Sequence, residues 1–165
     1  MTIEQLNSMD RAAFASAVGW VFEHSPWVAE RAWESRPFAD FQALHAEMVR
    51  QVERAAPREQ LALLRAHPDL GARARIGPAS TAEQTGAGLD RLTPDEFESL
   101  ARLNGAYKEE FGFPFLYAVK GSAKHDILAA LERRLSSTPE AERAEALRQV
   151  FRIAGFRLEQ LLASD

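Results

Sequence analysis

The segment His67-Pro68-Asp69-Leu70-Gly71 opens the part of the chain that decides the fold. Proline disfavours helical geometry at the preceding residue, so the helix before this segment should end at or just before His67. The helical pattern breaks again near Gly86 and Gly88, and a third time at Phe111-Gly112-Phe113-Pro114-Phe115. We therefore expect an irregular central segment between two helical regions.

Apolar residues recur at spacings of three and four on both sides of this segment, which is the pattern of amphipathic helices. No stretch alternates apolar and polar residues over the length of a strand, and no repeat or long linker divides the chain. The sequence predicts an all-α, single-domain bundle of seven to eight helices with an irregular central loop segment, forming one domain over residues 1–165. The first expected helices are residues 10–23 and 27–33, followed by a helix that carries Phe38 to Val52 and a short helix that carries Leu61 to Arg65 and ends before His67. Four more are expected to begin after Ser80, Thr93, Ser122 and Thr138.

Capping signals mark where several of these helices begin. Thr93-Pro94-Asp95-Glu96 combines a capping box with proline at the first helical position. Ser80 and Glu83 have the same capping-box spacing and predict a short helix that starts after Ser80. Ser122 is expected to cap the next helix, and Thr138-Pro139 is expected to start the last one.

Composition excludes several functional classes. The chain of 165 residues has no cysteine and a net charge of −4, with a pI near 5.6. Disulfides and thiolate chemistry are excluded, and an acidic balance argues against nucleic-acid binding. No apolar run approaches the roughly 20 residues that span a bilayer. The start lacks a signal-peptide pattern, and the end, Leu162-Ala163-Ser164-Asp165, differs from a Ser-Lys-Leu address, so we expect a cytoplasmic location.

His67 is the first candidate for chemistry. Imidazole moves protons near neutral pH, and the last carbonyls of the preceding helix favour its protonated form. Asp69 is near enough in sequence to bond the ring or the loop backbone. The alternative is that this histidine only caps the helix end.

Glu83 and Gln84 are the second pair of candidates. At a helix N-terminus, free N–H groups bind anionic or carbonyl oxygens, and a carboxylate beside a histidine forms an acid–base pair. Glu83 has an alternative role as the closing residue of the capping box with Ser80. The two roles are compatible.

The segment 111–115 and the extended run after it form a third candidate. A run that leaves N–H and C=O groups unpaired offers them to a polar, planar ligand. The alternative is that the aromatic residues pack a core around a helix end.

Arg157 lies among apolar positions of the last helix. A buried guanidinium must be paired or must meet an anionic ligand, so the alternatives are a ligand contact, a structural ion pair or a snorkelling side chain. No histidine pair has the spacing of a helical metal site, and we expect no metal. Lys120 and Lys124 have no local feature that would make either one a Schiff-base lysine.

Taken together, these motifs resemble one family, the OHCU (2-oxo-4-hydroxy-4-carboxy-5-ureidoimidazoline) decarboxylases. The resemblance rests on His67-Pro68-Asp69-Leu70-Gly71, on the Ser-x-x-Glu-Gln pattern that begins at Ser80, and on residues 103–115. It extends over essentially the whole chain, from Glu23-His24-Ser25-Pro26-Trp27 to the Ile-Ala-x-x-Arg-Leu pattern that ends at Leu158.

The resemblance implies an all-α enzyme, a carboxy-lyase that converts OHCU to S-allantoin and CO₂ in urate degradation without a cofactor. His67 and Glu83 are then the catalytic residues. The expected partners are the small-molecule substrate and a second copy of the chain in a homodimer, for which Trp20, Trp27 and Trp33 offer apolar surface. No nucleic acid and no membrane is expected as a partner. The implied substrate-binding residues are Pro68, Ser80, Gln84, Tyr117, Ala118, Val119, Lys120, Gly121 and Arg157.

Two other classes of function stay open. The chain could be a lyase or hydrolase that acts on a related ureido heterocycle. It could also be a helical interaction module without catalysis, in which case the region of His67 would be buried and would lack a pocket.

Overall fold

The computed structural model describes residues 1–71 and 78–163, and in these ranges it contains nine α-helices, two 3₁₀ helices and no strand. The all-α prediction is confirmed, with one helix more than the sequence indicated. That helix is α1, Ile3–Asn7, which Thr2 caps by accepting a hydrogen bond from the Gln5 N–H. At five residues it is too short to show an apolar period.

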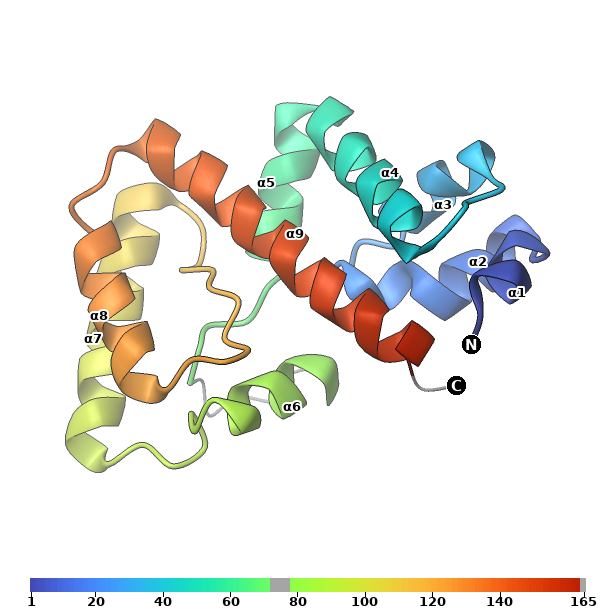
Figure 1. Ribbon diagram of the computed structural model, residues 1–165. Helices are drawn as coiled ribbons and strands as arrows, with labels where there is room; N and C mark the ends of the chain where they lie inside the picture. The colour runs from blue at the N-terminus through green and yellow to red at the C-terminus, as the bar shows by residue number, and fades with distance from the viewer. Residues whose placement is uncertain (72–77, 164–165) are drawn as a thin grey trace. The chain divides into compact units, whose positions relative to one another are not determined.

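The chain divides into two compact units, 1–66 with 150–165, and 67–149. The first unit contains α1 and the helices of the N-terminal region, together with the second half of α9. Helices α2, α3 and α4 of this unit contact one another in chain order (Figure 1). Its remaining helices are α2 (Arg11–Val18), the 3₁₀ turn Gly19–Val21, α3 (Trp27–Ala32), the 3₁₀ turn Trp33–Ser35, α4 (Phe41–Arg54) and α5 (Pro57–Arg65).

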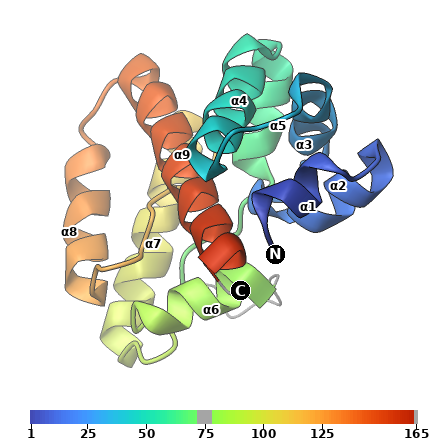
Figure 2. The same ribbon diagram turned by 45° about the vertical axis from the view of Figure 1, so that its right-hand side comes forward.

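The second unit contains α6 (Pro78–Gly86), α7 (Pro94–Phe111), α8 (Lys124–Arg134) and the first half of α9 (Pro139–Ala163). Helices α7 and α8 lie side by side in both ribbon views (Figures 1 and 2). Between them the chain is irregular. The largest fully buried side chains of this unit are Leu100, Tyr107, Phe115, Ile127 and Leu131.

The predicted caps of α7 and α9 are confirmed. The Thr93 hydroxyl accepts from the Glu96 N–H, while the Glu96 carboxylate accepts from the Thr93 N–H. The Thr138 hydroxyl accepts from the Ala141 N–H at the start of α9. At the other end of α7, Gly112 takes a left-handed conformation with φ of 81° and stops the helix, as glycine at this position commonly does.

Two predicted caps are wrong. Helix α8 is capped one residue later than expected, at Ala123, whose N–H donates to the Asp126 carboxylate. Ser122 instead closes a turn by donating its N–H to the Val119 carbonyl. The Ser80 cap is also wrong, because α6 already begins at Pro78. Proline is favoured in a first helical turn, and its signal overrides the spacing of Ser80 and Glu83.

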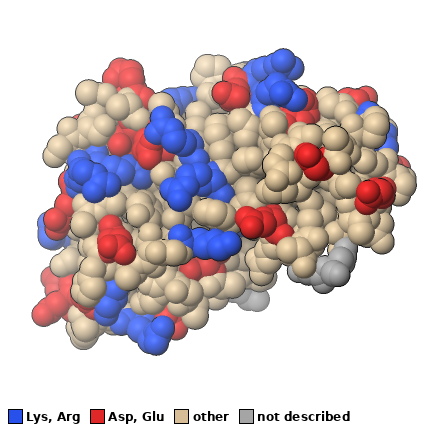
Figure 3. Space-filling view, in the orientation of Figure 1, with Lys and Arg blue, Asp and Glu red and all other residues tan. Residues whose placement is uncertain are grey.

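No helix of the described ranges is long and apolar enough to cross a membrane. The face in Figure 3 carries basic and acidic side chains close together.

Candidate active site

His67 lies directly after α5, as the sequence predicted. The helix ends at Arg65, Ala66 keeps a helical conformation as its cap, and the chain then leaves the helix. The side chain of His67 is buried, with 7% of the residue exposed, and it has interaction partners. A buried imidazole in a non-helical segment is held in one environment, which a proton-transfer group requires.

Three side chains of α6 and α7 bond the described part of the loop that follows His67, residues 69–71. The Gly71 N–H donates to Gln84 Oε1 over 2.8 Å. The Leu70 carbonyl accepts from Asn104 Nδ2 over 3.0 Å. Lys108 Nζ pairs with the Asp69 carboxylate at 3.2 Å. The loop is therefore fixed by side chains of α6 and α7.

Gly71 is itself required by this geometry. Its φ is +72°, and a Cβ at this position would stand 2.5 Å from Leu100 Cδ2. An L-residue would therefore be strained by the backbone conformation and would also collide with the side chain of Leu100. The sequence showed this glycine only as a loop signal.

Helix α6 presents three of the predicted site residues on one face. Because α6 begins at Pro78, Ser80, Glu83 and Gln84 lie within the helix at spacings of three and four, which brings their side chains together. Ser80 and Gln84 are buried, at 6% and 7% exposed, and Glu83 is half-buried. The hydrogen bond from Gly71 to Gln84 places this face against the loop that begins at His67.

The aromatic segment 111–115 packs a core, which was the alternative for this segment. The ring of Tyr107 lies 4.6 Å from that of Phe111, 5.9 Å from Phe113 and 5.4 Å from Phe115, measured between centroids. The last two contacts have edge-to-face geometry, which aromatic pairs favour. The aromatic residues therefore anchor the start of the run that follows.

The run after this segment is extended, and buried side chains form hydrogen bonds with backbone groups on one of its edges. Phe115 and Tyr117 stack with ring centroids 5.9 Å apart, as side chains two residues apart do when they point to one side of an extended chain. The Leu116 carbonyl accepts from Arg134 Nη1, and the Ala118 N–H donates to Gln149 Oε1. The N–H of Ala118 is therefore bonded within the protein.

The opposite edge of this run is open. The N–H and C=O of Tyr117 and the N–H of Val119 make no hydrogen bond with any residue in the described ranges. Lys120 and Gly121 are exposed and belong to the turn that Ser122 closes, where Gly121 has a φ of 81°. Among the described residues, the backbone groups of this edge without a hydrogen bond are thus the N–H and C=O of Tyr117 and the N–H of Val119.

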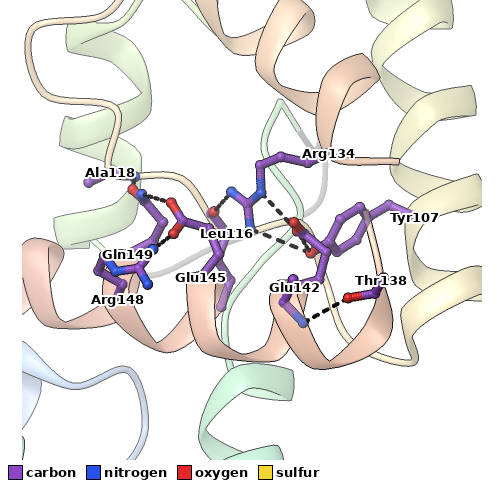
Figure 4. A network of polar contacts seen from close by, with 10 residues as sticks. Tyr107, Leu116, Ala118, Arg134, Thr138, Glu142, Glu145, Arg148 and Gln149 are labelled. Carbon is purple, nitrogen blue, oxygen red and sulfur yellow. Dashed lines mark hydrogen bonds and ion pairs between the residues drawn. The ribbon is translucent and has the colours of Figure 1, made fainter. Parts of the chain in front are cut away.

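A buried polar network lies behind the run (Figure 4). The Tyr107 hydroxyl donates to the Glu142 carboxylate, which also pairs with Arg134 Nε at 2.8 Å. Burial raises the pKa of Tyr107 well above its usual value, and the hydrogen bond to Glu142 adds to this rise. Tyr107 is therefore a neutral donor, and Arg134 and Glu142 form the charged pair.

Arg157 belongs to the first unit and has a protein partner there. Its Nη1 lies 2.9 Å from Glu23 Oε2 and also donates to the Trp20 carbonyl over 3.3 Å. Only 4% of Arg157 is exposed. The structural ion pair that the sequence left open is therefore present, and a contact with substrate stays a prediction.

Four residues that hold the candidate site were not predicted from the sequence, namely Asn104, Lys108, Arg134 and Gln149. All but Lys108 are buried. Gln149 follows Glu142 and Ala146 at helical spacing, so its place on the inner face of α9 was detectable. Nothing in the sequence indicates which backbone groups these side chains reach. Within the described ranges, no group of three His, Asp or Glu side chains is placed to bind a metal ion.

The fold and these side chains define a class of protein. It is an all-helical protein in which a buried imidazole, a carboxylate-bearing helix face and an open peptide edge belong to one compact unit. These groups suit acid–base chemistry on a small polar ring.

Comparison with known proteins identifies the family. The OHCU decarboxylase family model matches residues 7–159, and the chain belongs to this family. It is 47% identical over 165 residues to the 2-oxo-4-hydroxy-4-carboxy-5-ureidoimidazoline decarboxylase of Haloferax volcanii, covering 100% of this chain and 98% of that protein. It is 44% identical to a uric acid degradation bifunctional protein of Bacillus sp. (strain TB-90), covering 98% of this chain and 32% of that protein.

A solved structure agrees with this assignment. A crystal structure of (S)-allantoin synthase superposes with a TM-score of 0.79 at 36% identity, covering 98% of this chain. The chain spans about half, 54%, of the length of that protein.

Proposed function

We propose that this protein is a carboxy-lyase that converts OHCU to S-allantoin and CO₂ in urate degradation. The match to the OHCU decarboxylase family over residues 7–159 carries this conclusion. The structure supports it through the loop after His67, which side chains of α6 and α7 hold in place.

The reaction can proceed on protein groups alone. The bond between the ring carbon and the carboxylate breaks, and its electron pair moves into the adjacent C=N system of the heterocycle. The hydroxyl-bearing carbon becomes a carbonyl as the hydroxyl loses its proton, and a proton is added to the carbon that becomes the stereocentre. The ring nitrogen that received the electron pair takes a further proton from solvent, which completes the balance. Orientation of the carboxylate and stabilisation of the developing charge are the tasks left to the protein.

His67 and Glu83 are the residues we assign to the two proton movements. Glu83 binds the substrate hydroxyl, and His67 assists loss of the carboxylate and supplies the proton to one face. The half-burial of Glu83 on the face of α6 that Gln84 ties to the His67 loop supports this pairing. Pro68 lies in that loop, and Ser80 and Gln84 lie on that face of α6. A binding role for Arg157 stays a prediction.

The peptide run contributes backbone hydrogen bonds. The open N–H and C=O of Tyr117 and the open N–H of Val119 suit the amide edge of a ureido group or ring, which has both donors and acceptors. Ala118, Lys120 and Gly121 set the course of the run beside these groups.

Circular dichroism tests the proposed activity. Urate is oxidised in a coupled assay, and the allantoin bands are followed with and without the protein. The protein should speed the appearance of one enantiomer, whereas His67→Ala and Glu83→Gln should each slow turnover by at least about 100-fold. Near wild-type turnover in both variants would refute the assignment of His67 and Glu83 as catalytic residues. Racemic product at the uncatalysed rate would refute the proposed activity.

We further propose that the chain is one domain that works as a homodimer in the cytoplasm. The family match runs through both compact units, which supports a single domain. Trp20 has 39% of its surface exposed and supplies apolar surface for a second copy. Light scattering after size exclusion tests the dimer, and cell fractionation tests the location.

A further inference from the structure

Two buried side chains hold the peptide run to which the proposed function assigns substrate binding (Figure 4). Arg134 Nη1 donates to the Leu116 carbonyl over 2.6 Å, and Gln149 Oε1 accepts from the Ala118 N–H over 2.9 Å. Arg134 and Gln149 are 7% and 5% exposed. Neither side chain is part of the edge that the proposed function gives to the substrate.

These two bonds decide which edge of the run is open. In an extended chain, the N–H and C=O of successive residues point to opposite sides. Leu116 and Ala118 use one side for Arg134 and Gln149. Tyr117, between them, must therefore turn its N–H and C=O to the other side.

Each anchor is itself fixed by a carboxylate. Arg134 Nε pairs with Glu142 at 2.8 Å, and its guanidinium lies 4.6 Å from the ring centroid of Phe115. Gln149 Nε2 donates to Glu145 Oε1 over 2.9 Å. Because an ionised carboxylate only accepts hydrogen bonds, Glu145 orients the amide of Gln149 so that Oε1 faces Ala118.

We propose that Arg134 and Gln149 are positioning residues that hold the Tyr117–Val119 edge in the register the substrate needs. The inference rests on the proposed function. It predicts that removing an anchor weakens substrate binding at this edge, beyond any loss of stability.

Gln149→Met is the first test, because methionine keeps the length of the side chain and removes both polar atoms. We expect KM for OHCU to rise about tenfold with kcat within about threefold of wild type, the pattern for lost binding that is equal in ground and transition states. Amide hydrogen exchange at Ala118 should become faster. The matched control is Ile127→Val in the buried face of α8, which should lower Tm and leave KM unchanged.

A paired exchange tests whether the hydrogen bonds themselves matter. In Glu145→Gln/Gln149→Glu, the new carboxylate accepts from Ala118 and from the new amide, so both bonds and the net charge are retained. KM should return to within about threefold of wild type. Arg134→Lys should raise KM, because one ammonium cannot reproduce the two directed contacts that the planar fork makes with Leu116 and Glu142.

The outcomes separate this inference from the proposed function. If the wild-type protein does not turn over OHCU, both the proposed function and this inference are refuted. If the wild type is active and KM is unchanged in Gln149→Met and Arg134→Lys, only the inference is refuted. An equal rise of KM in Ile127→Val also removes it, because the effect would then follow stability. If Gln149→Met does not fold, the paired exchange and Arg134→Lys decide.

Discussion

The buried pair of Arg157 and Glu23 allows a structural role and a binding role to be separated. Their side chains are 5% and 8% exposed, and the charged atoms are 2.9 Å apart. Removing one partner leaves the other charge buried alone, which costs about 3–5 kcal/mol. For a chain of this size, about 4 kcal/mol corresponds to a fall in Tm of roughly 8–16 °C. Arg157→Met should therefore destabilise the protein strongly.

The double variant Arg157→Met/Glu23→Leu should recover much of that loss. Replacement of a whole buried pair by apolar side chains is often neutral or better, so the double variant should exceed Arg157→Met in stability by about 2 kcal/mol. A residual cost remains because the Trp20 carbonyl loses its donor. Urea unfolding followed by circular dichroism measures all three proteins. Purely additive losses, with the double variant least stable, would refute the coupling.

Kinetics of the same folded variant test the binding role. If Arg157 contacts substrate, KM for OHCU in the double variant should rise more than about tenfold. Glu23→Gln is the matched control, since it keeps Arg157 with a neutral acceptor and should change KM little. An unchanged KM in the double variant would leave Arg157 with the ion pair as its only role.

Three further predictions concern the second unit. Tyr107→Phe removes a hydroxyl that donates to a buried carboxylate and should lower the free energy of unfolding in urea by about 2 kcal/mol. The control is Tyr117→Phe, whose hydroxyl is half-buried and 3.3 Å from its partner, and it should cost less than about 0.5 kcal/mol. Equal losses in the two variants would contradict the importance of the Tyr107–Glu142 hydrogen bond. The hydrogen bond from Lys124, with those from the Thr93 cap, lowers the pKa of Glu96 to about 2, so its stabilisation is full above about pH 4.5 and is lost as pH falls toward about 2. Wild type should lose more stability than Glu96→Gln over that window, and parallel curves would contradict the shift. Gly71→Ala should lower the free energy of unfolding by about 1–3 kcal/mol or more and reduce turnover. The reason is the φ of +72° and the new Cβ, which would lie 2.5 Å from the side chain of Leu100. A variant as stable as wild type would contradict this reasoning.

Local signals were enough to predict most helix boundaries. Pro68 ends α5 before His67, and Thr93 with Glu96 starts α7. Each of these signals acts through residues within one helical turn. The same reasoning failed at Ser80, because Pro78 supplies a stronger start two residues earlier. It failed again at Ser122, where the turn to Val119 competes for the backbone.

The candidate site was predicted as a set of residue types, and its connections were not. His67, Glu83 and Gln84 were identified from motifs and from the chemistry of their side chains. That Gln84 accepts from the Gly71 N–H, 13 residues away, was not readable. Nor was the use of the Ala118 N–H by Gln149, 31 residues later.

The sequence by itself determined the all-α class, the breaks at His67 and Gly112, and the residues able to do acid–base chemistry. These properties depend on helical periodicity, on proline and glycine, and on side-chain type. The tertiary structure decided which polar groups are already bonded and which are open. Arg157 meets Glu23 across 134 residues of chain. Ala118 gives its N–H to Gln149, whereas the N–H of Tyr117 makes no hydrogen bond with any described residue. Such partners depend on how the chain folds back on itself, which the pattern of neighbouring residues does not encode.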